Sequence, residues 1–424
     1  MDWLRREPVR DLAVRAVLFK GTRDLLPIYA LYGVLFADHG LSTAQISLLL
    51  AIWSVTAFVL EVPSGAWADT VSRRGLLILS CVLQASCFAI WMVAPSFLGF
   101  AVGFMIWGVA GSLESGTFEA LIYDDLVARD KPSAYASIMG WARGAQEFTV
   151  LIAILSAAPL FALGGYALVG WVSVGVGVLH TLTALALPSA PVAISATAVD
   201  DLDDDPAPEP VGPHVKSISP QSRYLSMLKT GVSEALHVRR VRRGVLLGAL
   251  LYGVTAFDEY FGLLAVSGGA STSTSALLVG VTVAGSLIGS LLAGHTESLS
   301  SRTIAAALFL AGILFIAGSL TVGATAGPAW IWIGFIGIGI AYGIDFNAEV
   351  VAGARLQAAI EGPARATVTS ISGLLSEIVA LAVFAFVAIA TQHLSMSTTI
   401  ALLGTVLLAS ALLTPTWMPP RHSD

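Results

Sequence analysis

The positively charged residues of this chain are confined to one side of a series of about twelve apolar stretches. All 22 Lys and Arg residues fall in alternate connections, near the chain ends or, for Lys20, Arg23 and Arg143, inside apolar stretches toward the same side. The connections on the opposite side contain no Lys or Arg: 38–44, 95–96, 159–165, 267–275, 324–328 and 392–395. Because cationic side chains resist translocation across a bilayer, this pattern predicts a multi-pass membrane protein with both termini in the cytoplasm.

The composition supports the same conclusion. Hydrophobic residues make up 56% of the chain and charged residues 12%, with a mean hydropathy of +0.81. A water-soluble fold has too little interior for so much apolar surface. The apolar runs are continuous and about 20 residues long, which indicates membrane-spanning helices; a barrel would show alternating segments. The expected spans are 14–36, 44–67, 75–94, 97–122, 134–158, 165–187, 244–266, 274–294, 303–325, 328–351, 367–390 and 396–414.

One long polar interruption divides these spans six and six. We expect an N-terminal six-helix bundle over residues 1–188 and a C-terminal six-helix bundle over residues 244–424. The segment between them, 189–243, begins with an acidic, Pro-rich run and turns basic toward its end. Its first part has too few hydrophobic residues to fold alone, so we expect a cytoplasmic linker. Its second part is either an amphipathic helix on the inner membrane surface or a solvated stretch of topology-fixing charge.

The two halves share a weak internal repeat that is centred on Pro132 in one half and Pro363 in the other. Acidic residues stand in nearly the same register around each proline, two before it and one after it. The corresponding pairs are Glu114 and Asp345, Glu119 and Glu349, and Glu147 and Glu377. Six-plus-six repeats are typical of alternating-access transporters. The first of these pairs forms either packing partners or parts of a gate.

The most specific local pattern runs from Glu61 to Arg74, at the end of span 44–67 and in the connection after it. It reads Glu-Val-Pro-Ser-Gly-Ala-Trp-Ala-Asp-Thr-Val-Ser-Arg-Arg. This pattern resembles the signature loop of the major facilitator superfamily, Gly-x-Leu-Ala-Asp-Arg-x-Gly-Arg-Arg, and its first residues are similar to a Glu-x-Pro-Ser-Gly variant of bacterial exporters in that superfamily. The matching positions are Gly65, Ala68, Asp69, Arg73 and Arg74, while Trp67, Thr70 and Ser72 depart from the pattern.

The resemblance implies an all-α membrane protein with twelve transmembrane helices in two pseudo-symmetric six-helix bundles around a central cavity. It also implies a conformational latch at Gly65, Asp69, Arg73 and Arg74 that forms in one state only. Gly65 allows close approach of helices, and Asp69 can accept hydrogen bonds from a helix N-terminus or from one of the two arginines. The alternative is that the arginines only fix the topology.

One hallmark of proton-driven exporters is absent from the fourth span. Such proteins often carry an Arg four residues before a Gly, and here Trp107 precedes Gly111 and Ser112 precedes Gly116. Uptake or uniport by the same fold therefore stays open as an alternative to efflux.

Ionisable side chains at bilayer depth are costly, which makes them candidates for function. At a rise of 1.5 Å per helical residue, Asp24, Glu147 and Glu377 come near the middle of the bilayer. Asp258 and Glu259 come out central or slightly toward the outside. We treat these five acids as proton-coupling candidates, with Asp24 first because it has no evident partner on its own helix face. A structural role is the alternative for each.

A second group of residues is expected to line the substrate cavity: Arg23, Tyr29, Trp107, Glu114, Arg143, Tyr260 and Asp345. Arg23 points about 100° away from Asp24 around a helix, so its partner is expected on another helix. It either clamps an anionic group of the substrate or serves as a structural partner. Arg143 and Glu147 are spaced i, i+4 and can neutralise one another.

Together these observations predict a secondary active transporter that exports a small amphipathic molecule, as a proton-coupled multidrug-type antiporter of a bacterial inner membrane. Uptake, uniport and a membrane scaffold or receptor without transport are the alternatives. The seven His residues show no metal-ligand spacing, and Cys81 and Cys87 lie on different faces of span 75–94. We expect no enzyme activity, no metal and no cofactor. The expected partners are a small-molecule substrate, protons and the lipid bilayer, with no nucleic acid, and the chain is expected to be a monomer.

Glycines recur at a spacing of four residues in two of the expected spans. The pairs are Gly285 with Gly289 in span 274–294, and Gly339 with Gly343 in span 328–351. Small residues at this spacing allow helix backbones to approach closely. We therefore expect tight helix contacts that can slide, although packing alone also accounts for the pattern.

Overall fold

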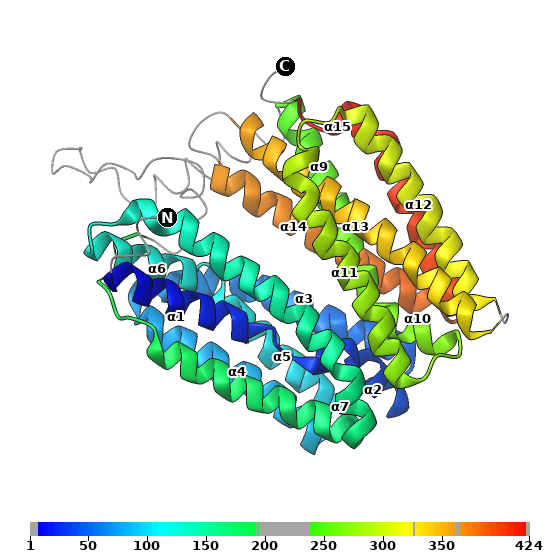
Figure 1. Cartoon of the computed structure of the whole chain (residues 1–424), viewed down its shortest axis with the longest axis horizontal. Helices are drawn as coiled ribbons and strands as arrows, with labels where there is room; N and C mark the ends of the chain where they lie inside the picture. Colours follow the sequence, from blue (N-terminus) through cyan, green and yellow to red (C-terminus); the bar gives the residue numbers. More distant parts are fainter. Residues whose placement is uncertain (1–6, 192, 195–237, 325–326, 361–364, 421–424) are drawn as a thin grey trace. The chain divides into compact units, whose positions relative to one another are not determined.

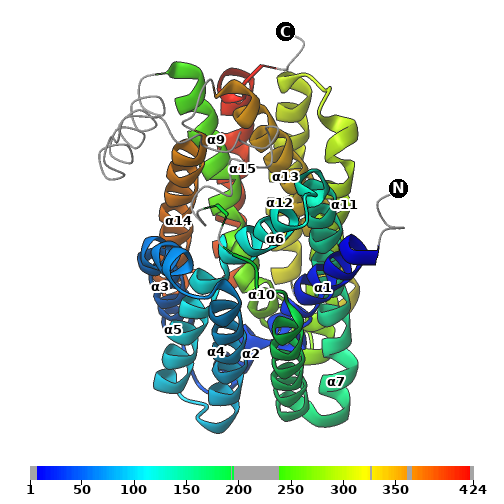
Figure 2. The ribbon, with the colours of Figure 1, turned by 90° about the vertical axis from the view of Figure 1, so that its left-hand side faces the viewer.

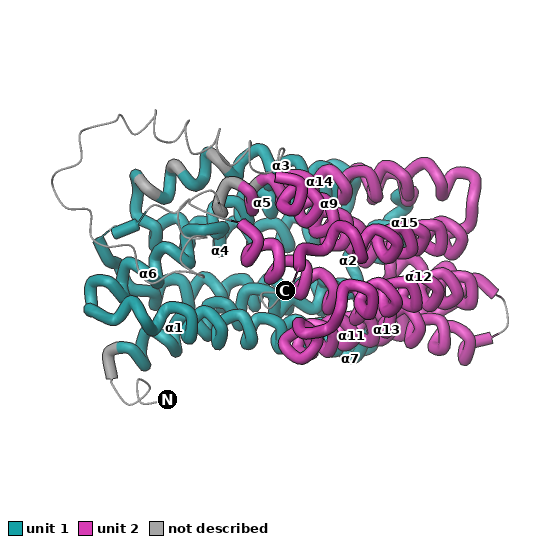
Figure 3. The backbone as a smooth tube through the Cα atoms, turned by 90° about the horizontal axis from the view of Figure 1, so that it is seen from above, with its two compact units in different colours: residues 1–41, 49–209 teal, residues 42–48, 210–424 magenta. Residues whose placement is uncertain are grey.

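The computed structural model describes residues 7–191, 193–194, 238–324, 327–360 and 365–420, and every regular element in this part of the chain is helical (Figures 1 and 2). The chain divides into two compact units (Figure 3). Unit 1 comprises residues 1–41 and 49–209, and unit 2 comprises residues 42–48 and 210–424. Most of the expected linker, residues 195–237, lies outside the described residues, so its amphipathic helix stays a prediction.

Both units consist of long helices joined by short connections. The elements that begin before residue 190 are α1 (Glu7–Arg23), η2 (Pro27–Ala30), α2 (Tyr32–Asp38), α3 (Thr43–Thr70), α4 (Arg73–Val93), α5 (Phe97–Glu114), α6 (Thr117–Ala128), η3 (Pro132–Ala134) and α7 (Tyr135–Ala186). The later ones are α9 (Arg239–Val254), η5 (Thr255–Tyr260), α10 (Phe261–Ser267), α11 (Thr272–Thr296), α12 (Ser301–Gly323), α13 (Pro328–Ala359), α14 (Arg365–Ala390) and α15 (Met396–Trp417). The first turns of α3 belong to unit 2 and the rest of it to unit 1.

Serine side chains begin five of these helices. Each accepts a hydrogen bond from the backbone N–H three residues further on, and these serines are Ser72, Ser96, Ser271, Ser300 and Ser395. Such caps satisfy N–H groups that the first turn of a helix leaves unpaired. Apolar residues then continue the five helices for 18 to 25 residues, enough to cross a hydrocarbon core about 30 Å thick.

Ten helices among the described residues are long and apolar enough to cross a membrane, whereas the sequence predicts twelve spans. The difference arises at two places. The span expected at 14–36 is broken into α1, η2 and α2, and the spans expected at 134–158 and 165–187 both fall within α7. A straight helix of 52 residues would extend for about 78 Å, more than twice the thickness of the hydrocarbon core. The non-helical Gly164 and Gly165 therefore mark a turn between two spans.

The first helical stretch of each half is interrupted near its centre. In unit 1, α1 ends at Arg23, Leu26 is extended and Pro27 opens η2. Proline lacks an N–H group and disfavours the helical conformation of the residue before it, which accounts for the break. In unit 2, α9 gives way to the 3₁₀ helix η5, which carries Asp258 and Glu259, before α10 resumes. Both breaks place carboxyl groups on irregular backbone inside an otherwise apolar stretch.

Aromatic side chains form a closely packed cluster in unit 1, around α2, α4 and α5. Phe36, Trp91, Phe100 and Phe104 are fully buried. The ring centroids of Phe36 and Phe100 are 4.2 Å apart, and those of Trp91 and Phe104 are 4.9 Å apart. Because apolar burial gains little inside a bilayer, close packing of this kind is what holds the helices together.

Glycines bring two helices of unit 2 into backbone contact. A Cβ atom added at Gly289 of α11 would lie 1.9 Å from the carbonyl oxygen of Gly343 of α13. At Gly285 the corresponding distance to the carbonyl oxygen of Gly339 would be 2.1 Å. No side chain fits at either position, so the prediction of a tight helix contact from the glycine spacing is confirmed.

Candidate functional site

A buried ion network lies where α1 ends in unit 1. The Lys20 Nζ atom is 3.0 Å from Oε1 of Glu114, and the Arg23 Nε atom is 2.7 Å from Oε2 of the same carboxylate. Lys20 also lies 3.2 Å from a carboxylate oxygen of Glu119. Glu114 is the last residue of α5 and is only 4% exposed. The expectation that Arg23 has its partner on another helix is therefore confirmed.

Asp24 extends this network through the break after α1. It accepts hydrogen bonds from Nη1 of Arg23 at 3.0 Å, from the hydroxyl of Tyr29 at 3.0 Å and from the side-chain amide of Gln146. The sequence showed no evident partner for Asp24 on its own helix face, on the assumption that the helix continues through this residue, and the contact with Arg23 contradicts that expectation. Since α1 ends at Arg23, the carboxylate of Asp24 and the guanidinium of Arg23 can meet despite their adjacent positions.

Aromatic rings lie beside this ion network. The rings of Tyr29 and Trp107 are stacked, with centroids 5.2 Å apart and an interplanar angle of 17°. The indole rings of Trp53 and Trp107 have their centroids 5.3 Å apart. All three side chains are partly exposed, as is Arg23. A planar or cationic solute can stack on such rings while its polar groups reach the adjacent charges.

Some of the polar groups at this site were not predicted from the sequence. Gln146 donates to Asp24, and Thr22 and Nδ1 of His180 are 3.0 Å apart. The imidazole ring of His180 also packs on Phe19, with centroids 4.5 Å apart. The available signal was the occurrence of amide and imidazole side chains inside apolar stretches. Their spacing gave no indication of which helices they would join.

Arg143 and Glu147 lie on α7, before and after Gln146 in the sequence, and both are exposed. The described residues show no direct ion pair between these two side chains, and their mutual neutralisation stays a prediction. Both stay candidates for a transport role.

The unit 2 candidates gather around η5 and α13. Asp258 accepts a hydrogen bond of 2.6 Å from the hydroxyl of Tyr342, while Glu259 is partly exposed. Tyr260 is fully buried and presents no surface to a solute in this conformation. Asp345 is also fully buried. Glu377 of α14 is partly exposed.

The signature-loop arginines make contacts at one end of unit 1. Arg73 is 3% exposed, and its Nη1 atom is 2.6 Å from Oδ2 of Asp124 on α6. It also donates to the carbonyl oxygen of Ala68 at 3.2 Å, and Arg74 donates to the carbonyl oxygen of Leu185. Gly65 is buried, but the side chain of Asp69 lies outside the described part of the structure. Whether Asp69 meets an arginine or a helix N-terminus stays a prediction.

Arg73 and Asp124 also form hydrogen bonds with the backbone of the segment that follows α7. Oδ1 of Asp124 accepts hydrogen bonds from the backbone N–H groups of Ala193 at 2.9 Å and Ile194 at 3.2 Å. Arg73 donates to the carbonyl oxygen of Ile194. This arrangement ties the segment after α7 to α4 and α6, a contact that the loop pattern alone did not predict.

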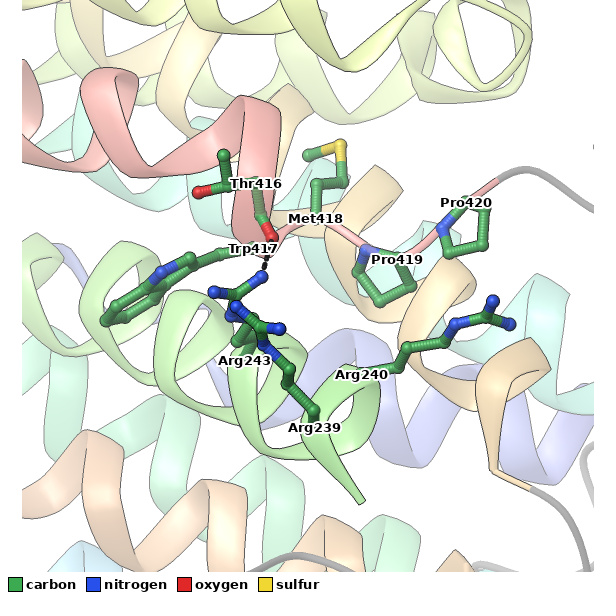
Figure 4. Close-up of a pocket in the computed structure, with 8 residues that line it drawn as sticks. All are labelled: Arg239, Arg240, Arg243, Thr416, Trp417, Met418, Pro419 and Pro420. Carbon is green, nitrogen blue, oxygen red and sulfur yellow. Dashed lines mark hydrogen bonds between the residues drawn. The ribbon is translucent and has the colours of Figure 1, made fainter. Parts of the chain in front are cut away.

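A shallow pocket in unit 2 gathers cations where α9 begins. It is lined by Arg239, Arg240 and Arg243 together with residues 416–420 at the end of α15 (Figure 4). Arg243 donates from Nη1 to the carbonyl oxygen of Thr416 at 3.1 Å. None of the residues lining this pocket is acidic, and none belongs to the transport candidates.

The described residues contain no cluster of three His, Cys, Asp or Glu side chains suited to a metal ion, and Cys81 and Cys87 are buried free thiols.

Long apolar helices, two interrupted helices and charged groups at the interruptions define a multi-pass membrane protein of the transporter class. The sequence profile of the Major Facilitator Superfamily matches residues 18–349, and the chain belongs to this family. Membership identifies a transporter rather than an enzyme and confirms the family, the fold class and the multi-pass character that were predicted from the sequence.

Among solved structures, the chain is similar to a mutant form of the nucleoside transporter NupG. The TM-score is 0.72 at 12% sequence identity, and the match covers 95% of this chain and 98% of the other. At this identity the likeness establishes the fold alone. No curated protein matches the sequence.

Proposed function

We propose that this protein is a secondary active transporter that moves a small amphipathic molecule out of a bacterial cell by proton-coupled alternating access. The observation that carries the proposal is the unit 1 site, where Lys20, Arg23, Asp24 and Glu114 form an ion network beside stacked aromatic rings. Charged side chains inside a bilayer are costly unless they pair with each other or bind a solute. A solute with an aromatic body and a polar group is complementary to both parts of the site.

The orientation proposed for the protein places both termini in the cytoplasm of a cell with an inner membrane. The support is the absence of Lys and Arg from every second connection. Reporters fused after residues 40, 161, 270 and 326 should read as external, and one placed at residue 205 should read as cytoplasmic. An external signal at 205 would overturn the six-plus-six arrangement and the proposed domains 1–188 and 244–424.

Proton coupling is assigned first to Asp24, with Glu147, Glu377 and the Asp258–Glu259 pair as alternatives. Arg23 is shared between Asp24 and Glu114. A proton on Asp24 would remove its attraction for the guanidinium, while Glu114 would still hold Arg23. The cation then becomes available to a polar group of the substrate, which links protonation to substrate binding.

The decisive assay is transport into inside-out vesicles under an imposed pH gradient, with a panel of cationic and anionic dyes. Asp24→Asn should abolish transport driven by the pH gradient and keep exchange of substrate, because the neutral amide imitates the protonated acid. Glu147→Gln and Glu377→Gln are the controls, since the internal repeat places them at corresponding positions. If Asp24→Asn keeps the parental pH dependence while one control loses it, the coupling site has been assigned to the wrong helix.

Uptake or uniport is the second candidate function. It is favoured by the missing Arg in the fourth span and by the structural likeness to a protein described as a nucleoside transporter. Nucleosides and their analogues therefore belong in the substrate panel. Counterflow that is independent of any gradient would favour uniport, whereas neither flux nor binding with any compound would favour a scaffold or receptor.

A further inference from the structure

Asp345 is an acidic residue whose carboxyl group has no hydrogen-bond partner among the residues that the structure describes. It lies in the middle of α13, its exposure is 0%, and neither of its carboxylate oxygens accepts or donates a hydrogen bond among the described residues. An ionised carboxylate that is removed from water without compensation is strongly disfavoured, whereas a neutral carboxylic acid is tolerated.

The corresponding residue of unit 1 shows how this fold otherwise accommodates a buried acid. Glu114 precedes its loop proline by the same 18 residues and is 4% exposed. Both of its oxygens are paired, one with Lys20 and the other with Arg23. The two acids are buried to a similar extent. Two cations accompany Glu114 in unit 1, whereas no partner of Asp345 is observed among the described residues of unit 2.

The charged groups around Asp345 offer no compensation along its helix or from the helices that pack against it. On α13 itself, Glu349 is a like charge, and the hydroxyl of Tyr342 already donates to Asp258. Arg355 is ten residues further along, about 15 Å at the helical rise. The titratable groups of the packed elements are Arg239, Arg240, Arg242, Arg243 and Tyr252 on α9, Asp258, Glu259 and Tyr260 on η5, His295 at the end of α11 with Glu297 after it, and Arg302 at the start of α12. The cations among them all lie at helix ends.

We propose that Asp345 is a proton-binding site, occupied in the conformation seen here and emptied when a conformational change of unit 2 admits water to its carboxyl group. In the occupied state one carboxyl oxygen carries the proton. On release this O–H bond breaks, the proton passes to water and a carboxylate remains.

The inference deepens the proposed function in its coupling step, but occupancy by a proton is measurable without any substrate. Infrared difference spectra of the purified protein in lipid nanodiscs report the carbonyl stretch of protonated carboxylic acids, which shifts in D₂O. At neutral pH, Asp345→Asn should lose one component of this band. Glu114→Gln is the matched control and should keep the band, because the Glu114 carboxylate is paired with two cations. An unchanged band in folded Asp345→Asn would overturn the proposal.

A second pair of variants tests the same point through stability. Asp345→Leu replaces a neutral, unpartnered group by an apolar side chain, so the thermal unfolding midpoint should stay at or above that of the parent. Glu114→Leu leaves two cations without their carboxylate, so its midpoint should fall clearly. An equal fall in both variants, repeated in Asp345→Asn, which adds no volume, would overturn the inference.

The outcomes also separate this inference from the proposed function. If no transport is found and Asp345→Asn still loses the band, the proton site at Asp345 is supported and the proposed transport function is contradicted. If transport driven by the pH gradient is found and the band is unchanged, the transporter stands and the proton is carried by another group.

Discussion

The Arg73–Asp124 pair is expected to contribute strongly to the stability of unit 1. The two side chains are 2% and 0% exposed, and the ion pair measures 2.6 Å. Asp124→Ala would remove this carboxylate from the buried Arg73 guanidinium and would remove the acceptor for the N–H groups of Ala193 and Ile194. Removal of one partner from a buried ion pair costs about 3–5 kcal/mol. We expect the free energy of unfolding to fall by about that amount.

The neighbouring acid provides a matched control. Asp125 pairs with Arg129 one turn further along the chain, and the Arg129 side chain is 28% exposed. Because the Arg129 end of this pair reaches solvent, we expect Asp125→Ala to destabilise the protein less than Asp124→Ala does. Both variants can be compared by denaturant titration of the purified, detergent-solubilised protein, with tryptophan fluorescence as the signal.

A double variant separates the loss of the charge partner from other effects. Arg73→Met with Asp124→Leu removes both charges of this pair together, so the double variant should lose less stability than Asp124→Ala alone. If Asp124→Ala is no more destabilising than Asp125→Ala, the pair does not stabilise the unit. If the double variant is as unstable as the sum of the single variants, the two side chains act independently.

Two further predictions concern the helix contact in unit 2 and the signature loop. Gly289→Ala should destabilise the protein by about 1–3 kcal/mol through overpacking, whereas Gly294→Ala in the same helix, with nothing within 4 Å of the added Cβ, should be neutral or stabilise by up to about 1 kcal/mol. Equal shifts of the thermal unfolding midpoint in the two variants would contradict this. Asp69→Asn should slow substrate counterflow through a shifted conformational equilibrium at normal expression. Unchanged transport in the inserted protein would reduce the loop to a topology signal.

The helical class and the approximate spans could be predicted because a bilayer imposes one simple requirement on sequence. Continuous apolar runs must be helical there, since every backbone group needs a partner inside its own segment. Interruptions within a span are harder to predict, because they depend on local backbone chemistry. Pro27 carried a visible signal for the break after α1, whereas η5 contains no proline at all.

The candidate site was predicted in part. The direction in which the Arg23 side chain leaves its helix correctly indicated a partner on another helix. The internal repeat identified Glu114 as a residue of interest. The sequence did not show that the two residues meet, because spacing along a chain carries no information about which helices are neighbours. Asp24 was misjudged for a local reason, since its contacts depend on the end of α1. The assignment of transport roles to these residues stays a prediction.

The two units handle buried acids differently, and this difference suggests how substrate recognition and proton binding are divided. In unit 1 the cations Lys20 and Arg23 accompany Asp24 and Glu114, so a change at Asp24 also alters the position of a cation. In unit 2 no described partner accompanies Asp345, so a change there alters only the occupancy by a proton. Asp24→Asn should therefore change the affinity for substrate as well as the coupling. Asp345→Asn should keep the affinity and lose the release of protons, and an identical phenotype for the two variants would show that recognition and proton binding are not separated.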